Sequence, residues 1–144
     1  MSVFVDTGVF YAHHDVDASR HDSALQGLNL LLQSTEYGQV VTSDYVYDEA
    51  VTLTVRRTGR IQDGIALGRR IRGDGYPQAI RLLHATESVF DDAVETFETY
   101  DDHTLSFTDA MTIAQIENHG IDSLLSFDDD FDGILDRLDP VSIG

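Results

Sequence analysis

Short apolar runs alternate along the chain with longer segments in which apolar residues recur every three or four positions. The short runs predict buried strands at residues 3–5, 39–42, 123–126 and 140–143. The periodic segments predict helices at residues 22–32, 45–55, 61–71, 77–83, 91–100 and 107–118. Strands separated by helices favour the α/β class, with a parallel sheet that is covered on both faces.

Local signals mark where several of these elements begin and end. Ser43 and Ser106 are suited to cap the helices that follow them, and Gly120 is suited to end the helix before it. Asp6-Thr7-Gly8 directly follows the first strand and predicts a turn, because aspartate and glycine dominate turns. No repeat, low-complexity tract or proline-rich linker interrupts the chain, so we expect residues 1–144 to form a single domain.

Composition narrows the class of protein. With 42% hydrophobic residues the chain can bury a core, and without cysteine it has no disulfide, thiolate zinc site or cysteine nucleophile. The N-terminus lacks the basic and apolar segments of a signal peptide, and no apolar run approaches the roughly 20 residues of a membrane span. We therefore expect a soluble, cytoplasmic protein with no membrane partner.

The charge is strongly negative and unevenly distributed. Twenty aspartates and six glutamates accompany nine arginines and no lysine, and the formal net charge is -17. This composition is typical of halophilic proteins, because molar salt screens repulsion between carboxylates, and it argues against a generic basic coat for nucleic acid. Residues 50–85 are the exception, with seven arginines, two acids and a local charge of +5.

Acidic residues follow two of the predicted strands. Asp6 comes directly after residues 3–5, and three aspartates at residues 128–130 come just after residues 123–126. In a parallel α/β sheet the functional site lies beyond the carboxyl ends of the strands. These acids are therefore candidates for a common site.

Two further acids lie on apolar helix faces. Glu49 shares a side of its helix with Val46 and Leu53, and Asp109 lies on the same stripe as Ile113. A buried carboxylate without a partner is strongly disfavoured, and no lysine is available to compensate it. Mg²⁺ or Mn²⁺ would do so, because these ions prefer carboxylate oxygens and water. The same ion can lower the pKa of a bound water and offset phosphate charge, which predicts a metal-dependent phosphodiesterase.

Each acid taken alone also has a structural interpretation. Asp109 completes the capping-box pattern of Ser106-Phe-Thr-Asp. Glu49 suits a solvated helix edge, and residues 128–130 suit a solvated acidic turn. Asp48 is an alternative to Glu49, although only Glu49 shares the apolar stripe. Only the joint arrangement of the four acids favours a functional interpretation.

Together the motifs resemble the PIN-domain ribonucleases, and among them the VapC-type toxins of toxin–antitoxin pairs. The resemblance covers essentially the whole chain and rests on four segments in order: Val3-Phe-Val-Asp-Thr7, Tyr47-Asp-Glu49, Leu105-Ser-Phe-Thr-Asp-Ala110 and Leu125-Ser-Phe-Asp-Asp-Asp-Phe131. It implies a three-layer α/β/α sandwich around a parallel sheet. It also implies an endoribonuclease that uses Mg²⁺ or Mn²⁺ and an activated water to cut single-stranded or structured RNA, leaving a 5′-phosphate and a 3′-hydroxyl. A homodimer neutralised by a cognate antitoxin is the assembly that the resemblance implies.

The resemblance also assigns roles to residues. The family's four acidic positions correspond to Asp6, Glu49, Asp109 and Asp128, which would hold one or two metal ions as the catalytic centre. Asp130 is the rival of Asp128, because the family's local pattern often contains both. Thr7 is a departure, since relatives often have asparagine at that position.

The arginines of residues 50–85 begin directly after the helix segment of Glu49. They are candidates for contacts with RNA phosphates or with the antitoxin, and pairing with neighbouring acids is the alternative. The six histidines lack the spacing of a zinc site, and we expect His13, His14 and His21 in a solvated loop.

The sequence also invites comparison with three other classes of protein. Asp6-Thr7-Gly8 matches the active-site tripeptide of aspartic proteases, but their fold is rich in β-structure. A phosphoacceptor receiver domain needs a catalytic lysine, which this chain lacks. The serious rival is a PIN-like module that binds RNA or protein without cutting.

Overall fold

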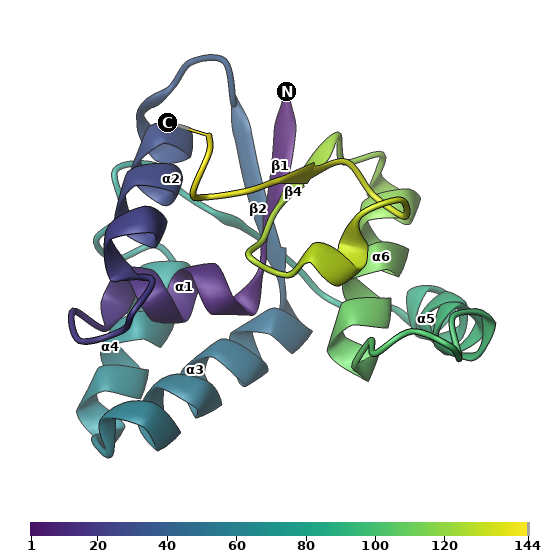
Figure 1. The fold of residues 1–144 in the computed structure, drawn as a ribbon, viewed down its shortest axis with the longest axis horizontal. Helices are drawn as coiled ribbons and strands as arrows, with labels where there is room; N and C mark the ends of the chain where they lie inside the picture. Colours follow the sequence, from purple (N-terminus) through teal and green to yellow (C-terminus); the bar gives the residue numbers. More distant parts are fainter. Residues whose placement is uncertain (144) are drawn as a thin grey trace.

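Five parallel strands form the central sheet in the order β3-β2-β1-β4-β5 (Figure 1). The computed structural model describes residues 1–143. The strands are Ser2–Val5 (β1), Gln39–Ser43 (β2), Arg81–Leu83 (β3), Ser123–Leu125 (β4) and Arg137–Leu138 (β5). Because β1 and β4 are neighbours in parallel register, with Val5 opposite Leu125, the residues that follow these two strands emerge side by side.

Helices cover both faces of the sheet. They are Thr7–His14 (α1), His21–Gln33 (α2), Asp44–Thr58 (α3), Ile61–Ile71 (α4), Glu87–Thr99 (α5) and Phe107–His119 (α6), with a short 3-10 helix at Asp129–Phe131 (η1). Figure 1 shows α1 and α2 on one side of the strands and α5 and α6 on the other. The predicted three-layer α/β/α sandwich is confirmed. Among the described residues, no helix is both long and apolar enough to cross a membrane.

The core lies between the sheet and these two layers. Val3, Phe4 and Val5 of β1 are all fully buried, because both faces of the strand are covered. Helix α6 is buried over the whole run 110–116, since it packs between the sheet and α5. The first turn of α6 is therefore held firmly beside the end of β4.

Two predicted elements were wrong in type or position. Residues 77–83 do not form a helix, because Arg81–Leu83 pairs with β2 as an edge strand. Residues 140–143 do not form a strand; they turn, and the amide groups of Ser142 and Ile143 both donate to Asp139. The terminal strand is instead Arg137–Leu138, paired with β4. Short apolar runs have no periodicity of their own, so the pairing partner decides their structure.

The predicted turn at Asp6-Thr7-Gly8 is instead the start of α1, with Asp6 as its N-cap. Helix α1 gives little sequence signal, because its buried residues are not confined to one face. The early histidines are consequently not in a solvated loop. The Nε2 atoms of His13 and His14 lie 3.0 Å and 2.8 Å from side-chain oxygens of Asn29 and Asp63, and His21 begins α2.

Candidate metal centre

A cavity of about 570 Å³ lies where β1 and β4 end, and its wall is rich in carboxylates. All four predicted acids line it, each from a different part of the fold. Asp6 follows β1, Glu49 is on α3, Asp109 is in the first turn of α6, and Asp128 precedes η1. The fold therefore brings the four acids to one cavity, together with the exposed neighbour Asp129.

Asp6 is the most buried of these acids, with 8% of its surface exposed. Its Oδ1 accepts a hydrogen bond from the Thr7 amide at 2.8 Å, and its Oδ2 accepts one from the Ser126 hydroxyl at 2.6 Å. Burial raises the pKa of Asp6 to about 7, with the charges of Asp109 and Glu49 adding to the rise and the bond from Ser126 opposing it. A cation at this position would stabilise the charged form of Asp6.

Asp109 combines a capping role with a place in the cavity. Its amide donates to Ser106 Oγ at 3.1 Å and its Oδ2 accepts from the Ser106 amide at 3.0 Å, so the capping box is confirmed. Burial raises the pKa of Asp109 to about 6, and the nearby charges of Asp128 and Glu49 contribute. The cap fixes the orientation of the carboxylate without removing it from the cavity wall.

Helix α3 places Glu49, but not Asp48, in the wall of the acidic cavity, although both residues line an adjoining one. Glu49 is half-buried and lines the acidic cavity together with Leu53, which lies one turn further along α3. Asp48 is exposed and lines an adjoining cavity of about 430 Å³ with Thr52 and Arg56. The geometry therefore favours Glu49 over Asp48 as the acid of α3.

The loop after β4 places Asp128, but not Asp130, in the wall of the acidic cavity. The Asp128 amide donates to Ser126 Oγ at 3.0 Å, and Asp128 lines the acidic cavity. The Oδ2 atom of Asp130 accepts a hydrogen bond from Thr104 at 2.6 Å, and Asp130 is not part of the cavity wall. The geometry favours Asp128 as the fourth acid.

A second grouping of acids overlaps the cavity. Carboxylate oxygens of Asp128, Asp129 and Asp130 all lie within 4.8 Å of one another. Exposed acidic groups of this kind are common without an ion. The cavity is the stronger candidate for a cation, because the charged forms of the buried Asp6 and the half-buried Asp109 need compensation there.

The donor set fits a hard divalent cation. Within the described residues, the cavity wall offers carboxylate and hydroxyl oxygens and no histidine. Oxygen donors of this kind suit Mg²⁺ or Mn²⁺, whereas zinc sites are usually built with nitrogen or sulfur ligands.

Three functional candidates escaped the sequence analysis. The Ser126 hydroxyl donates a hydrogen bond to Asp6, and its signal was its place as the last residue of a predicted strand. Arg20 and Phe127 line the cavity together, with the guanidinium carbon 4.9 Å from the ring centroid. Arg20 lies outside the arginine-rich residues 50–85, so no local pattern marked it.

Comparisons with known proteins find one matching family and several similar proteins. The family model of the PIN domain matches residues 3–134. The 23S rRNA-specific endonuclease VapC20 of Mycobacterium tuberculosis is 30% identical over 129 residues, which cover 90% of this chain and 91% of that protein. The crystal structure of VapC20, described as a sarcin–ricin loop cleaving toxin, matches with a TM-score of 0.78 and 27% identity over 92% of this chain and 94% of that chain. VapBC2 from Rickettsia felis shares the fold, with a TM-score of 0.69 and 12% identity over 96% of this chain and 98% of that chain.

Proposed function

The chain belongs to the PIN-domain family, and we propose that it is a Mg²⁺- or Mn²⁺-dependent endoribonuclease that acts as the toxin of a toxin–antitoxin pair. The observation that carries this proposal is the pair formed by the buried Asp6 and the half-buried Asp109, whose pKa values are raised to about 7 and about 6 in a cavity shared with Glu49 and Asp128. The similarity to an endonuclease over 90% of the chain supports the same reaction class.

In this proposal the residues of the cavity have different catalytic roles. Asp6, Asp109 and Asp128 would hold the ion, and Glu49 would complete the acidic wall by orienting a second ion or a water molecule. When bound, the ion supplies an activated water and offsets charge on the phosphate. Ser126 and the capping box of α6 keep Asp6 and Asp109 in fixed orientations, which preserves the arrangement before substrate arrives.

The proposed substrate is structured ribosomal RNA. The support is the name of the 30% identical relative, a 23S rRNA-specific endonuclease that aligns over nearly its whole length. Products with a 5′-phosphate and a 3′-hydroxyl are expected, because water attacks phosphorus and the 3′ oxygen leaves.

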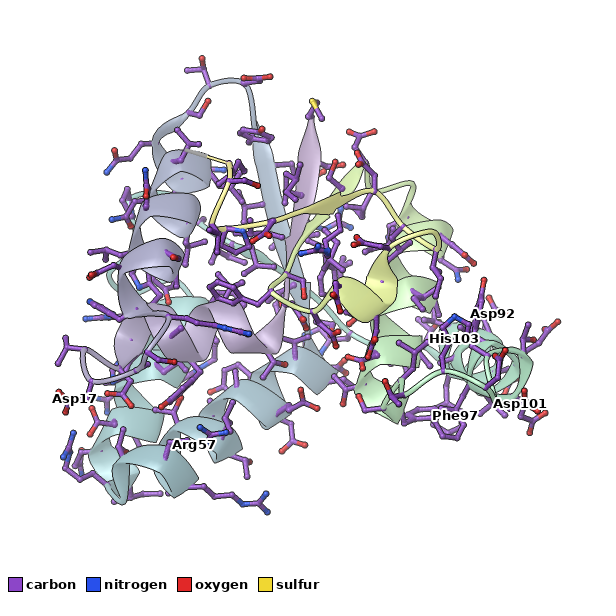
Figure 2. All side chains as sticks on the ribbon, in the orientation of Figure 1. Asp17, Arg57, Asp92, Phe97, Asp101 and His103 are labelled. Carbon is purple, nitrogen blue, oxygen red and sulfur yellow. The ribbon has the colours of Figure 1, made fainter. Side chains whose placement is uncertain are left out.

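The proposed partners are a cognate antitoxin and a second copy of the chain. The related VapC20 is described as a toxin, which supports an antitoxin. For the dimer, the support is an aromatic surface on α5, where Phe90 and Phe97 are 41% and 44% exposed. Their ring centroids lie 5.6 Å and 5.8 Å from that of Phe107, and Phe97 is labelled at the outer edge of the molecule in Figure 2.

The test is cleavage of purified ribosomal RNA by the full chain with Mg²⁺, with and without EDTA. Asp6→Asn and Asp109→Asn are each expected to lower the cleavage rate by about 100-fold or more, with an unchanged far-ultraviolet circular dichroism spectrum. Asp101→Asn removes an exposed acid outside the cavity and is the matched control. Full activity of folded Asp6→Asn would refute the site, and a wild-type chain that binds RNA without cutting it would favour the non-catalytic PIN-like module.

A further inference from the structure

A second cavity, of about 380 Å³, adjoins the acidic one. Four residues belong to both walls: Gly8, Arg20, Leu53 and Phe127. Beyond this common wall the second cavity continues to Tyr11 on α1 and Arg57 on α3. We call it the arginine–aromatic cavity, after Tyr11, Arg20, Arg57 and Phe127. An extended ligand that lies in the acidic cavity can continue directly into it.

Aromatic rings support both guanidinium groups of this cavity. The Arg20 guanidinium carbon lies 4.9 Å from the centroid of the Phe127 ring, and that of Arg57 lies 5.7 Å from the centroid of the Tyr11 ring. Arg57, labelled in Figure 2, projects from α3, whereas Tyr11 comes from α1. Cation–π contacts of this kind orient a guanidinium group and leave its N–H donors free for a ligand.

Neither arginine is neutralised by an acid of the chain, although acids outnumber arginines 26 to nine. Arg60 pairs with Asp63, and Arg137 pairs with Asp132. Within residues 1–143, no carboxylate oxygen lies within 4.0 Å of the side-chain nitrogens of Arg20 or Arg57. What sets Arg20 and Arg57 apart is that an aromatic ring orients each exposed guanidinium group in a cavity that adjoins the acidic one, where it is available to an anionic ligand.

We propose that the arginine–aromatic cavity is a nucleotide-binding subsite that holds the RNA strand next to the cleaved phosphodiester. This inference rests on the proposed nuclease function. Arg20, on the common wall, binds the phosphate adjacent to the scissile one, and Arg57 binds a phosphate further along the strand. Guanidinium planes and the two rings offer stacking surfaces for the intervening bases. The subsite counteracts the repulsion between the RNA backbone and the acidic cavity, so it contributes to substrate capture more than to the chemical step.

The first test measures RNA binding by fluorescence anisotropy. The full chain carrying Asp109→Asn, which is expected to cut at least about 100-fold more slowly, is titrated with a fluorescein-labelled single-stranded oligoribonucleotide at several KCl concentrations. Arg20→Gln and Arg57→Gln are each expected to raise Kd about 10-fold. Each is also expected to lower the slope of log Kd against log salt by about 0.7, because one phosphate contact is lost. Although Arg81 belongs to the arginine-rich residues 50–85, it lies on the edge strand β3 and lines neither cavity, so Arg81→Gln removes the same charge and should change neither value.

The second test separates binding from chemistry in the otherwise unmodified chain. Arg20→Gln and Arg57→Gln should raise KM about 10-fold and change kcat by less than about 3-fold, and Arg57→Lys should restore the salt slope because the charge remains. An unchanged KM and an unchanged salt slope in both Gln variants, relative to Arg81→Gln, would overturn the subsite. If KM and the salt slope stay unchanged but less antitoxin co-purifies with the Gln variants, the cavity contacts a protein and the RNA subsite is overturned. A wild-type chain that does not cut, with the expected loss of binding and salt slope, would refute the nuclease and support the subsite.

Discussion

The Ser126 hydroxyl lies 2.6 Å from Asp6 Oδ2 and joins the ends of two neighbouring strands, although the two residues are 120 positions apart. The Ser126 hydroxyl oxygen also accepts a hydrogen bond from the Asp128 amide at 3.0 Å. Ser126 is fully buried, so water does not compete for these bonds. One hydroxyl thus fixes the position of two of the four predicted site acids.

Replacement of this hydroxyl tests its role. Ser126→Ala is expected to destabilise the chain by about 1–2 kcal/mol, because a buried carboxylate and a backbone amide each lose a partner. It should also raise the pKa of Asp6 further, since the bond from Ser126 favours the charged form. Urea denaturation measures the first effect, and Mn²⁺-induced stabilisation at pH 7 measures the second through weaker metal binding.

Ser123 provides a matched control on the same strand. It is also buried, and its hydroxyl donates to Asp136 at 3.0 Å, outside the acidic cavity. Ser123→Ala should lose comparable stability and keep the Mn²⁺ response of the wild type. Identical metal responses in the two variants would show that Ser126 has only a structural role.

The raised pKa values of Asp6 and Asp109 predict the pH dependence of the metal-free chain. Both exceed the ordinary value of 3.8, so between about pH 4 and pH 7 these two groups bind more protons in the folded chain than in the unfolded chain. The contribution of these groups to the free energy of unfolding therefore decreases as pH rises through this window. Other carboxylates with lowered pKa values, such as Asp63, act in the opposite direction.

The difference between wild type and Asp6→Asn isolates this contribution. Asparagine cannot ionise, so in EDTA the variant is expected to be more stable than the wild type at pH 8 by about 1–2 kcal/mol, with no such advantage at pH 4. Thermal melting across this range gives the result. Mg²⁺ should remove the advantage by stabilising only the wild type, and a constant difference at all pH values would contradict the assignment.

Asp128 and Asp130 provide a second comparison within one loop. In the folded chain the Asp130 amide donates to Asp128 Oδ1 at 2.9 Å. Asp128→Asn keeps a side-chain oxygen that can accept this hydrogen bond, so the loop should remain folded. Cleavage is nevertheless expected to fall by about 100-fold, because a proposed metal ligand is lost. Asp130→Asn should lower kcat by less than about 3-fold. The reverse order of the two kcat values would make Asp130 the fourth acid.

Gly64 allows α4 to approach α3, the helix that carries Glu49. A Cβ at this position would lie 2.4 Å from Val55 Cγ2 and 3.3 Å from the Val51 carbonyl oxygen. Gly64→Ala is therefore expected to destabilise the chain by about 1–3 kcal/mol, despite the better helix propensity of alanine. Gly38→Ala is the control, because a Cβ there meets nothing within 4 Å, and urea denaturation should show it to be close to neutral.

Local pattern in the sequence was sufficient for most helices, for three of the strands and for the α/β class. It also pointed to the four acids, since Asp6 and Asp128 follow apolar runs and Glu49 and Asp109 interrupt apolar helix faces. These features are local, because a buried helix face or strand produces a periodic pattern of apolar residues within about ten residues. The capping box of Ser106 and Asp109 was visible for the same reason.

Tertiary structure decided everything that depends on a distant partner. Pairing with β2 makes Arg81–Leu83 a strand, and burial of α1 on several sides hides a helix that begins at Thr7. The hydrogen bond from Thr104 to Asp130 and the contact of Arg20 with Phe127 depend on side chains that meet only after folding. The sequence by itself determined which residues are apolar, acidic or able to cap a helix. Only the fold decided which of them share a cavity, because parallel strands bring together chain segments that no local periodicity connects.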